Sequence, residues 1–236
     1  MAEHIREHRS LLAATEKRAL IAIAHRLPPA INSDHLTALA LAAMALAGAG
    51  YALSRWDVRA LWLVVVALVL NWFGDSLDGT VARVRKVERP RYGFYVDHVL
   101  DIVGATLLFA GLAVSGFMTP WIALALLIAY LLVTSEVFLA TSVRGVFKMS
   151  FSGFGPTELR ILLAIGTIAL FRDPHVDLGV LGSPRLFDFS GLIAITGMAV
   201  ALLVNVVRNA TELARLEPRP KMNHESNLRE LRGLRG

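Results

Sequence analysis

Residues 75–101 read DSLDGTVARVRKVERPRYGFYVDHVLD, and this stretch is the most informative part of the sequence. It places four carboxylates at the ends of two segments that are otherwise apolar enough to cross a bilayer. A charged side chain at the centre of a membrane helix costs about 2.5–3.5 kcal/mol, so acids in such segments usually have a function. The stretch therefore predicts an all-α membrane protein with an acidic site.

The spacing of the acids predicts two facing stripes on two helices. One stripe combines two acids with two very small residues at i, i+3, i+4 and i+7: Asp75, Asp78, Gly79 and Ala82. The other follows at i, i+4 and i+8: Gly93, Asp97 and Asp101. Carboxylate oxygens are hard ligands that suit Mg²⁺ or Mn²⁺, and such ions often hold phosphate groups. Arg83 stands beside this predicted cage, where it could pair with a phosphate.

The complete pattern is Asp75-x2-Asp78-Gly79-x2-Ala82-Arg83-x9-Gly93-x3-Asp97-x3-Asp101. It resembles the motif of the CDP-alcohol phosphotransferases (CDP-alcohol phosphatidyltransferases), which are integral membrane enzymes of phospholipid synthesis. All eight fixed positions are present in order, although the x9 spacer is slightly longer than in the commonest form. A charged loop could match by accident, but such a loop has no need of Gly and Ala at helical spacing with the acids.

The resemblance implies a metal-dependent transfer from a CDP-alcohol to an acceptor alcohol, with CMP released and no covalent intermediate. We expect CDP-diacylglycerol as the donor and Mg²⁺ or Mn²⁺, as two ions, as the cofactor. The predicted metal ligands are Asp75, Asp78, Asp97 and Asp101. The predicted donor-binding residues are Asp75, Asp78, Gly79, Ala82, Arg83 and Gly93. Arg83 also counts as catalytic, and the resemblance makes Asp101 the candidate base, with a purely ligating role as the alternative.

Four further residues are candidates for binding the acceptor: His98, Arg144, Lys148 and Arg160. The run Asp97-His98-x2-Asp101 resembles the choline and ethanolamine branch, in which a CDP-aminoalcohol reacts with diacylglycerol. However, His98 points about 100° around the helix from Asp97, so a structural role is the alternative. The three basic residues could bind an anionic acceptor, or they could simply mark a cytoplasmic face.

Hydropathy predicts one domain of six transmembrane helices, residues 35–216. The predicted spans are 35–53, 58–82, 93–117, 120–143, 157–171 and 190–207, the first capped by Ser33 or Asp34 and the last continuing to residue 216. Residues 1–34 form a cytoplasmic segment in which 11–27 has the pattern of an amphipathic surface helix. Residues 217–236 form a charged cytoplasmic tail. Span five is short for a bilayer.

Composition and charge agree with this topology. The chain is 55% hydrophobic with a mean hydropathy of +0.56, and it has no cysteine for a disulfide or thiolate site. Of the 24 Lys and Arg residues, 20 fall on the side of the N-terminus. This bias predicts cytoplasmic termini and a cytoplasmic active site, and we expect a bacterial inner membrane. It also explains the high pI without any nucleic-acid partner.

The remaining expectations concern assembly and rival functions. The resemblance implies a homodimer, with weak support from small residues that permit close helix contact: Gly104, Ala105, Gly111 and Ala113. A cation-coupled transporter is the rival of a different class, but transporters place charged sites near the midplane and often contain repeats, which we do not find here. A scaffold with a decayed motif is disfavoured because the motif is complete.

Overall fold

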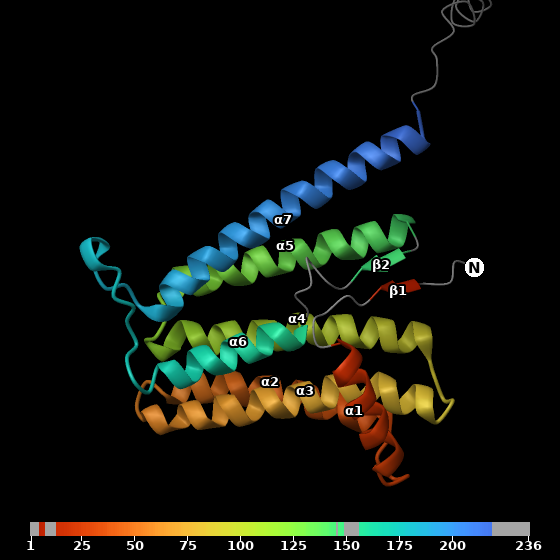
Figure 1. The fold of residues 1–236 in the computed structure, drawn as a ribbon, viewed down its shortest axis with the longest axis horizontal. Helices are drawn as coiled ribbons and strands as arrows, with labels where there is room; N and C mark the ends of the chain where they lie inside the picture. Colours follow the sequence, from red (N-terminus) through yellow and green to blue (C-terminus); the bar gives the residue numbers. More distant parts are fainter. Residues whose placement is uncertain (1–4, 8–12, 145, 149–155, 219–236) are drawn as a thin grey trace, which may run out of the picture.

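The computed structural model describes residues 5–7, 13–144, 146–148 and 156–218 (Figure 1). Its α-helices are α1 (Ala13–Arg26), α2 (Ser33–Leu53), α3 (Leu61–Val84), α4 (Pro90–Ser115), α5 (Pro120–Arg144), α6 (Pro156–Ala169) and α7 (Leu186–Leu216). Two short strands, β1 (Ile5–Glu7) and β2 (Val146–Lys148), pair in parallel. Two 3-10 turns are η1 (Val58–Ala60) and η2 (Gly179–Leu181). The predicted all-helical class is therefore confirmed apart from one small strand pair.

Five of the described helices are long and apolar enough to cross a membrane: α2, α3 with η1, α4, α5 and α7. Helix α6 has 14 residues, which is shorter than a bilayer crossing requires. Figure 1 shows that α6 begins midway along α3 rather than at the end of the bundle, which agrees with its short length. Several spans are thus found as predicted, while the count of six is not confirmed.

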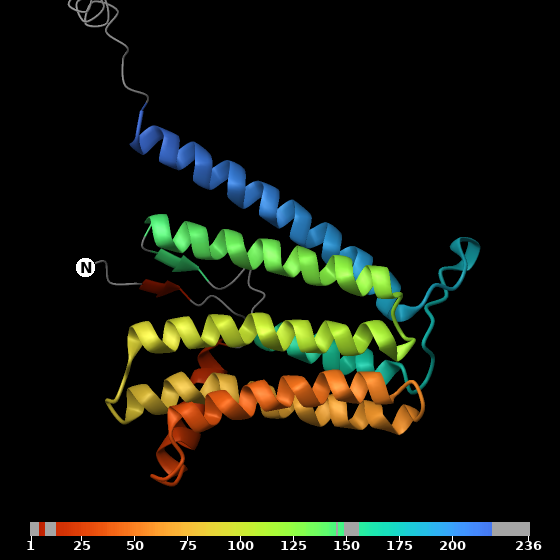
Figure 2. The same cartoon turned by 180° about the vertical axis from the view of Figure 1, so that it is seen from behind.

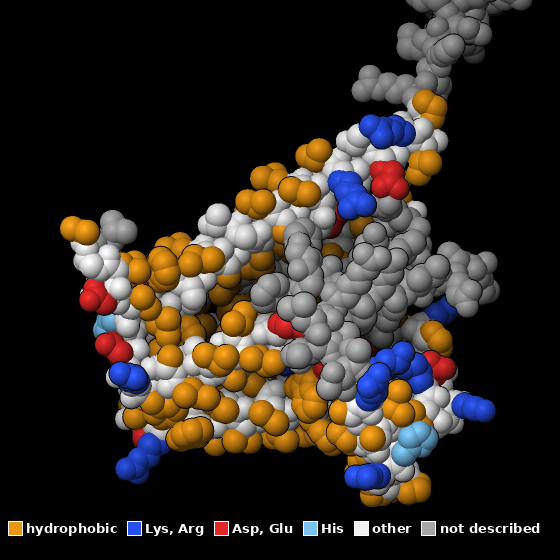
Figure 3. Space-filling view, viewed as in Figure 1, with side chains coloured by type: hydrophobic (Ala, Val, Ile, Leu, Met, Phe, Trp, Pro, Cys, Tyr) orange, Lys and Arg blue, Asp and Glu red, His pale blue; other side chains and the backbone are white. Residues whose placement is uncertain are grey.

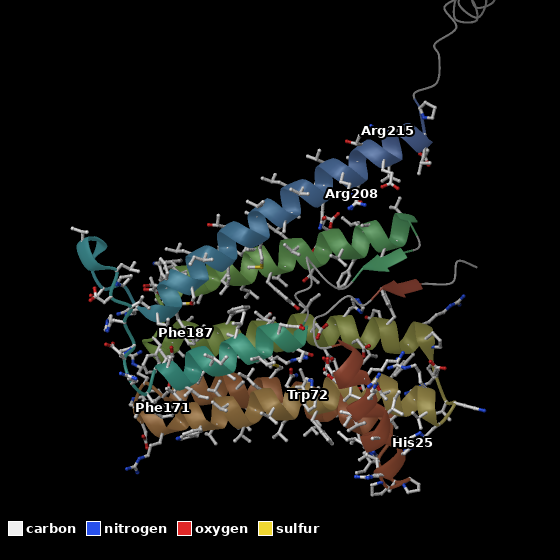
Figure 4. The ribbon with its side chains drawn as sticks, viewed as in Figure 1. His25, Trp72, Phe171, Phe187, Arg208 and Arg215 are labelled. Carbon is white, nitrogen blue, oxygen red and sulfur yellow. The ribbon has the colours of Figure 1, made fainter. Side chains whose placement is uncertain are left out.

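The helices form a bundle in which α2 packs on both α3 and α4, and α6 lies on α3. Helix α5 packs between α4 and α7, and the two views agree that α7 diverges from α5 toward its C-terminal end (Figures 1 and 2). Tyr51 and Phe187 meet edge to face at 6.0 Å, and Trp62 lies 5.1 Å from Phe171. Figure 4 shows Phe171 and Phe187 at the end of the bundle away from His25 of α1.

The ends of the helices follow local signals, with one correction. The cap of α2 is Asn32, not the predicted Ser33 or Asp34: its side chain accepts from the His35 N–H at 3.0 Å, and the His35 ring accepts from the Asn32 N–H. Helix α4 starts at Pro90, earlier than predicted, because proline suits the first helical turn. It stops before Gly116, which adopts the left-handed conformation at φ 85°.

The small residues of α4 serve packing within the chain. A Cβ on Gly111 would collide with the Gly48 backbone of α2, and one on Gly104 would lie 3.0 Å from Met44. Ala105 is buried as well. Gly104 and Gly111 therefore let α4 approach α2, and the prediction that they favour a dimer contact is wrong for these two glycines.

Helix α1 crosses the end of the bundle and packs on α3. Its Leu20 and Ala24 are buried against Leu36, Leu77 and Val81. In Figure 3, hydrophobic side chains cover the flank of the bundle while Lys and Arg gather around α1. A helix is thus found within the predicted range 11–27, with apolar residues packed on the protein, while its predicted place on the membrane surface stays a prediction.

Candidate active site

The two motif segments come together around one cavity of about 720 Å³. Its walls are the start of α2, the end of α3, the connecting loop and the start of α4. Six motif positions line it: Asp78, Gly79, Ala82, Arg83, Gly93 and Asp97. The helical spacing therefore predicted the right neighbours, and Asp75 and Asp101 lie one turn further from the loop, beside this cavity.

Asp78 is buried and held from two helices. Its Oδ2 accepts a 2.8 Å hydrogen bond from Thr37 Oγ1, and its Oδ1 accepts from the Gly79 N–H. The Ser33 hydroxyl also donates to the Asp78 backbone carbonyl at 3.0 Å. Because Thr37 and Ser33 belong to α2, this helix fixes the end of α3 at the site.

Asp75 faces α6, where Arg160 binds it. Arg160 Nη2 donates to Asp75 Oδ2 at 2.6 Å, and Arg160 Nε donates to Asn71 Oδ1 at 2.7 Å. Asn71 is buried and donates in turn to the Ala40 carbonyl at 3.0 Å. The guanidinium therefore bridges two residues that are one turn apart on α3, and it orients the Asp75 carboxylate.

Asp101 lies within electrostatic range of the other three carboxylates of the motif, and Asp78 lies within range of Asp75 and Asp97 as well. Asp78 is repelled by Asp97 and Asp75, and Asp101 is repelled by Asp75, Asp97 and Asp78. Arg160 attracts Asp101 and so balances part of this negative charge. Such a concentration of acids is unfavourable by itself, so a site of this kind suits a bound cation.

Arg83 and Gly79 form the floor at the cavity's outer end. The exposed Arg83 side chain folds back along α3, and its Nη2 donates to Thr80 Oγ1 at 3.1 Å. A Cβ on Gly79 would lie 3.3 Å from Arg83 Nη1, so the glycine leaves room for the guanidinium. Gly93 has open space on its Cα side, with nothing within 4 Å of an added Cβ.

Two arginines of the nine-residue spacer between Arg83 and Gly93 hold it against neighbouring parts of the chain. Arg89 pairs with Asp34 at the start of α2 and lies 4.1 Å over the Tyr92 ring. Arg85 donates to three carbonyls between α1 and α2, at 2.6 Å to Ile31, 2.9 Å to Leu27 and 3.0 Å to Pro28. The spacer thus forms a fixed wall of the cavity.

The four predicted acceptor residues have different positions. His98 is buried between the rings of Phe94 and Phe138, at 4.1 and 4.5 Å, and its Nδ1 bonds the Phe94 carbonyl. It is not among the residues that line the cavity. Of the basic group, only Arg160 has a described side chain, while the side chains of Arg144 and Lys148 lie outside the described residues.

A second cavity of about 460 Å³ lies beside the acids, between α3 and α6. Its walls are apolar along most of its length, with Leu68 and Val69 on α3 and Ile161 and Ala164 on α6. Trp72 completes the wall, and Glu16, Thr157 and Arg160 form a polar end. The arrangement suits a ligand that is apolar for most of its length and polar at one end.

The arrangement of the acids bears on whether they could bind a metal ion. Across the described ranges, no three His, Asp or Glu side chains are grouped tightly enough to hold an ion as they stand. The chemistry of the donors nevertheless fits, because the site gathers four carboxylates, whose oxygens are hard ligands. Arg160 binds only Oδ2 of Asp75, and a ligating carboxylate commonly has such an outer partner.

The family model for CDP-alcohol phosphatidyltransferases matches residues 31–209 of the chain. The chain belongs to this family. The match covers α2 to most of α7, and it therefore includes both motif segments as well as Arg160. Comparison with curated proteins finds no significant match.

Membership establishes the general activity. The protein is a transferase of substituted phosphate groups, with a CDP-alcohol and an alcohol as substrates, in membrane phospholipid synthesis. Members of the family generally depend on a divalent metal. The several apolar spans agree with an integral membrane protein.

Three residues of the site were missed from the sequence, and one of them could have been found. Asn71 precedes Asp75 by four residues in an apolar run, so it extends the same stripe by one turn. Thr37 and Tyr130 gave no such signal, because each lies on another helix. Tyr130 of α5 is close enough to interact with Asp101, Arg160 and Asp75.

Proposed function

We propose that this transferase uses CDP-diacylglycerol as its donor and passes the phosphatidyl group to an acceptor alcohol, with CMP released. The observation that carries the proposal is the meeting of six motif residues, Asp78 and Asp97 among them, around one cavity, with Asp75 and Asp101 close enough to interact electrostatically with these acids. A cavity of about 720 Å³ is also large enough for a nucleotide.

The two cavities support a division of the donor into polar and apolar parts. The cytidine and phosphates would occupy the first cavity, where Gly79 and Ala82 allow close approach and Arg83 pairs with the pyrophosphate. An acyl chain would enter the second cavity along α3 and α6, whose walls are apolar. A lipid donor uses both cavities, whereas a water-soluble CDP-aminoalcohol would leave the second to the diacylglycerol acceptor.

Asp75, Asp78 and Asp97 are the residues that would hold the metal, with Asp101 as a further ligand or as the base. When bound, one or two Mg²⁺ or Mn²⁺ ions would neutralise the phosphoryl oxygens of the donor. The hydrogen bonds that these acids accept would then orient them as metal ligands. Thr37 and the Gly79 N–H orient Asp78, and Arg160 orients Asp75.

Asp101 would accept the proton of the acceptor hydroxyl. The acceptor oxygen then forms a bond to the phosphorus that carries diacylglycerol, and the bond from that phosphorus to the bridging oxygen breaks. CMP leaves with the electron pair, so no covalent enzyme intermediate is required. The exposed position of Asp101 beside the acids allows an acceptor to reach it.

For the acceptor we keep Arg144, Lys148 and Arg160 as candidate contacts for an anionic group. Arg160 contacts Asp75, so any role toward the acceptor would be shared with that contact. The packing of His98 between two rings gives no support to a contact with an aminoalcohol.

We further propose that α6 acts as the sixth, shorter span and that α1 lies at the cytoplasmic membrane surface. The site would then open to the cytoplasm of a bacterial cell, and the Lys and Arg bias supports cytoplasmic termini. A homodimer remains our expectation for the assembly. Its contact must use surfaces other than Gly104 and Gly111, which face α2.

One experiment tests the function. The purified chain is supplied with CDP-diacylglycerol or a CDP-aminoalcohol, a panel of acceptor alcohols, and Mg²⁺, Mn²⁺ or EDTA. Release of CMP is measured, and the lipid product is identified by mass spectrometry. We expect metal-dependent CMP release from CDP-diacylglycerol. No CMP from any donor, together with cation flux into proteoliposomes, would support the transporter instead.

A further inference from the structure

Glu16 of α1 binds two helices through a single carboxylate oxygen. Its Oε1 accepts from Trp72 Nε1 at 2.7 Å and from Thr157 Oγ1 at 2.8 Å, with Ser76 Oγ at 3.5 Å. Trp72 and Ser76 belong to α3, and Thr157 belongs to the first turn of α6. Hydrogen bonds to a charged acceptor are stronger than those between neutral groups. The position of Trp72 between α1 and α6 can be followed in Figure 4.

These contacts lie next to the pair between Arg160 and Asp75. On α6, Thr157 precedes Arg160 by three residues, so both face the same side of the helix. On α3, Trp72 and Ser76 each directly follow a partner of Arg160 in sequence. Glu16 thus fixes the turn of α6 that presents Arg160 to α3.

A second, independent contact joins the N-terminal segment to the strand that follows α5. Strand β1, which precedes α1, pairs in parallel with β2, which follows α5. Strand β1 therefore contacts β2, while Glu16 contacts the first turn of α6. Neither contact involves the eight residues of the motif.

We propose that Glu16 is a positioning residue for the transfer reaction, holding the start of α6 so that Arg160 stays on Asp75 and Asn71. The inference rests on the proposed function for its catalytic consequence. Its structural content, that Glu16 fixes α6 on α3, stands apart from the identity of the substrates.

The kinetic test compares Glu16→Ala, which removes the acceptor, with Glu16→Gln, which keeps an oxygen at the same place. The matched control is Lys17→Ala, an exposed neighbour on α1. We expect Glu16→Ala to lower kcat by about 10- to 100-fold, the range for loss of an outer partner of a metal ligand, because Arg160 would no longer be held on Asp75. Glu16→Gln should retain most of the rate, and Lys17→Ala all of it. A kcat in Glu16→Ala equal to that of the wild type would overturn the proposal.

A double-mutant cycle separates positioning from general support of the fold. If Glu16 acts through Arg160, Glu16→Ala should cost little in a chain that already carries Arg160→Lys. If the loss of kcat in the double variant equals the product of the losses in the two single variants, Glu16 acts independently of Arg160. That result would overturn the proposal.

A distance measurement tests the same idea without turnover. The chain has no cysteine, so spin labels can be placed by Leu159→Cys on α6 and Tyr95→Cys on α4, both exposed positions. Glu16→Ala should broaden or shift the distance distribution, and Glu16→Gln should not. An unchanged distribution in Glu16→Ala would overturn the proposal even if the enzyme is active. If Glu16→Ala cannot be purified, Trp72→Phe, which removes one donor, is judged by the same readouts.

If the wild-type chain releases no CMP from any donor, the proposed function fails, and the distance measurement still decides the role of Glu16. If CMP is released and the distance between the spin labels is unchanged in Glu16→Ala, only the positioning role fails.

Discussion

Arg160 donates to Asp75 Oδ2 at 2.6 Å, so a basic residue of α6 contacts the first acid of the motif directly. The sequence had suggested that Arg160 binds an anionic acceptor. The contact gives Arg160 a role toward Asp75 instead, because the guanidinium fixes the Asp75 carboxylate and offsets part of the repulsion among the acids. Arg160 can hold Asp75 and also bind the acceptor only if the acceptor approaches beside Asp75.

Arg160→Ala should therefore change the metal dependence of the enzyme. We expect the Mg²⁺ concentration for half-maximal rate to rise by about 10- to 100-fold, because Asp75 loses the partner that orients it. Excess Mg²⁺ should restore part of the rate. Arg172→Ala, an exposed arginine three residues after the end of α6, is the control. A rise in the KM for the acceptor with unchanged Mg²⁺ dependence would assign Arg160 to the acceptor, and a rise confined to the donor KM would exclude that role.

Asp78→Asn should nearly abolish turnover while the protein still folds. The change removes a charge and a predicted ligand from a carboxylate that is buried and held by Thr37. Thr37→Val is the graded comparison: it removes only the outer hydrogen bond, so we expect a loss of about 10- to 100-fold. Activity is measured as CMP release at limiting Mg²⁺, with melting temperature as the control for folding. Substantial activity in Asp78→Asn would contradict the metal role.

Much of the fold could be predicted because hydropathy and helix-end signals are local. The spans at 35–53 and 120–143 match α2 and α5 closely, since Pro120 opens the helix and apolar residues fill it. The cap of α2 was misplaced because three capping residues in a row, Asn32, Ser33 and Asp34, compete for one position. Only the reciprocal bond from His35 favours Asn32.

Helical periodicity brought the motif residues together correctly, but it could not supply partners from other helices. The contacts of Asp78 with Thr37 and of Asp75 with Arg160 join residues far apart in sequence. The same limit explains the error at Gly104 and Gly111. Small residues show that something packs closely, and the sequence does not say whether the neighbour is α2 or a second chain.

Gly79→Leu should block the nucleotide. A branched side chain at this position would enter the cavity and displace Arg83, whose Nη1 would lie 3.3 Å from the new Cβ. Gly79→Ala is the matched control, because a methyl group requires only a small shift of the flexible Arg83 tip. We expect CMP with Mg²⁺ to raise the melting temperature of the wild type and of Gly79→Ala, but not of Gly79→Leu. Normal stabilisation of Gly79→Leu would mean that the nucleotide does not lie over this stripe.

His98→Ala should affect stability rather than the choice of acceptor. The ring is buried between Phe94 and Phe138, so its removal leaves a gap where α4 meets α5. We expect a loss of roughly 1–3 kcal/mol in the free energy of unfolding, seen as a lower melting temperature. The KM values for donor and acceptor should stay within twofold, which is about 0.4 kcal/mol. A changed preference among acceptors, with unchanged stability, would restore the interpretation in terms of an aminoalcohol.

Asp101→Asn separates the base from the ligands. If Asp101 takes the proton of the acceptor hydroxyl, its loss should lower kcat by roughly 10²- to 10⁴-fold, the usual contribution of acid–base assistance. Donor binding should survive, because Asp75, Asp78 and Asp97 still hold the metal and Arg83 still faces the pyrophosphate. The measurements are single-turnover CMP release and the affinity for CMP with Mn²⁺. A parallel loss of nucleotide affinity would make Asp101 chiefly a metal ligand, since a base that acts only on the acceptor has no reason to weaken the binding of CMP.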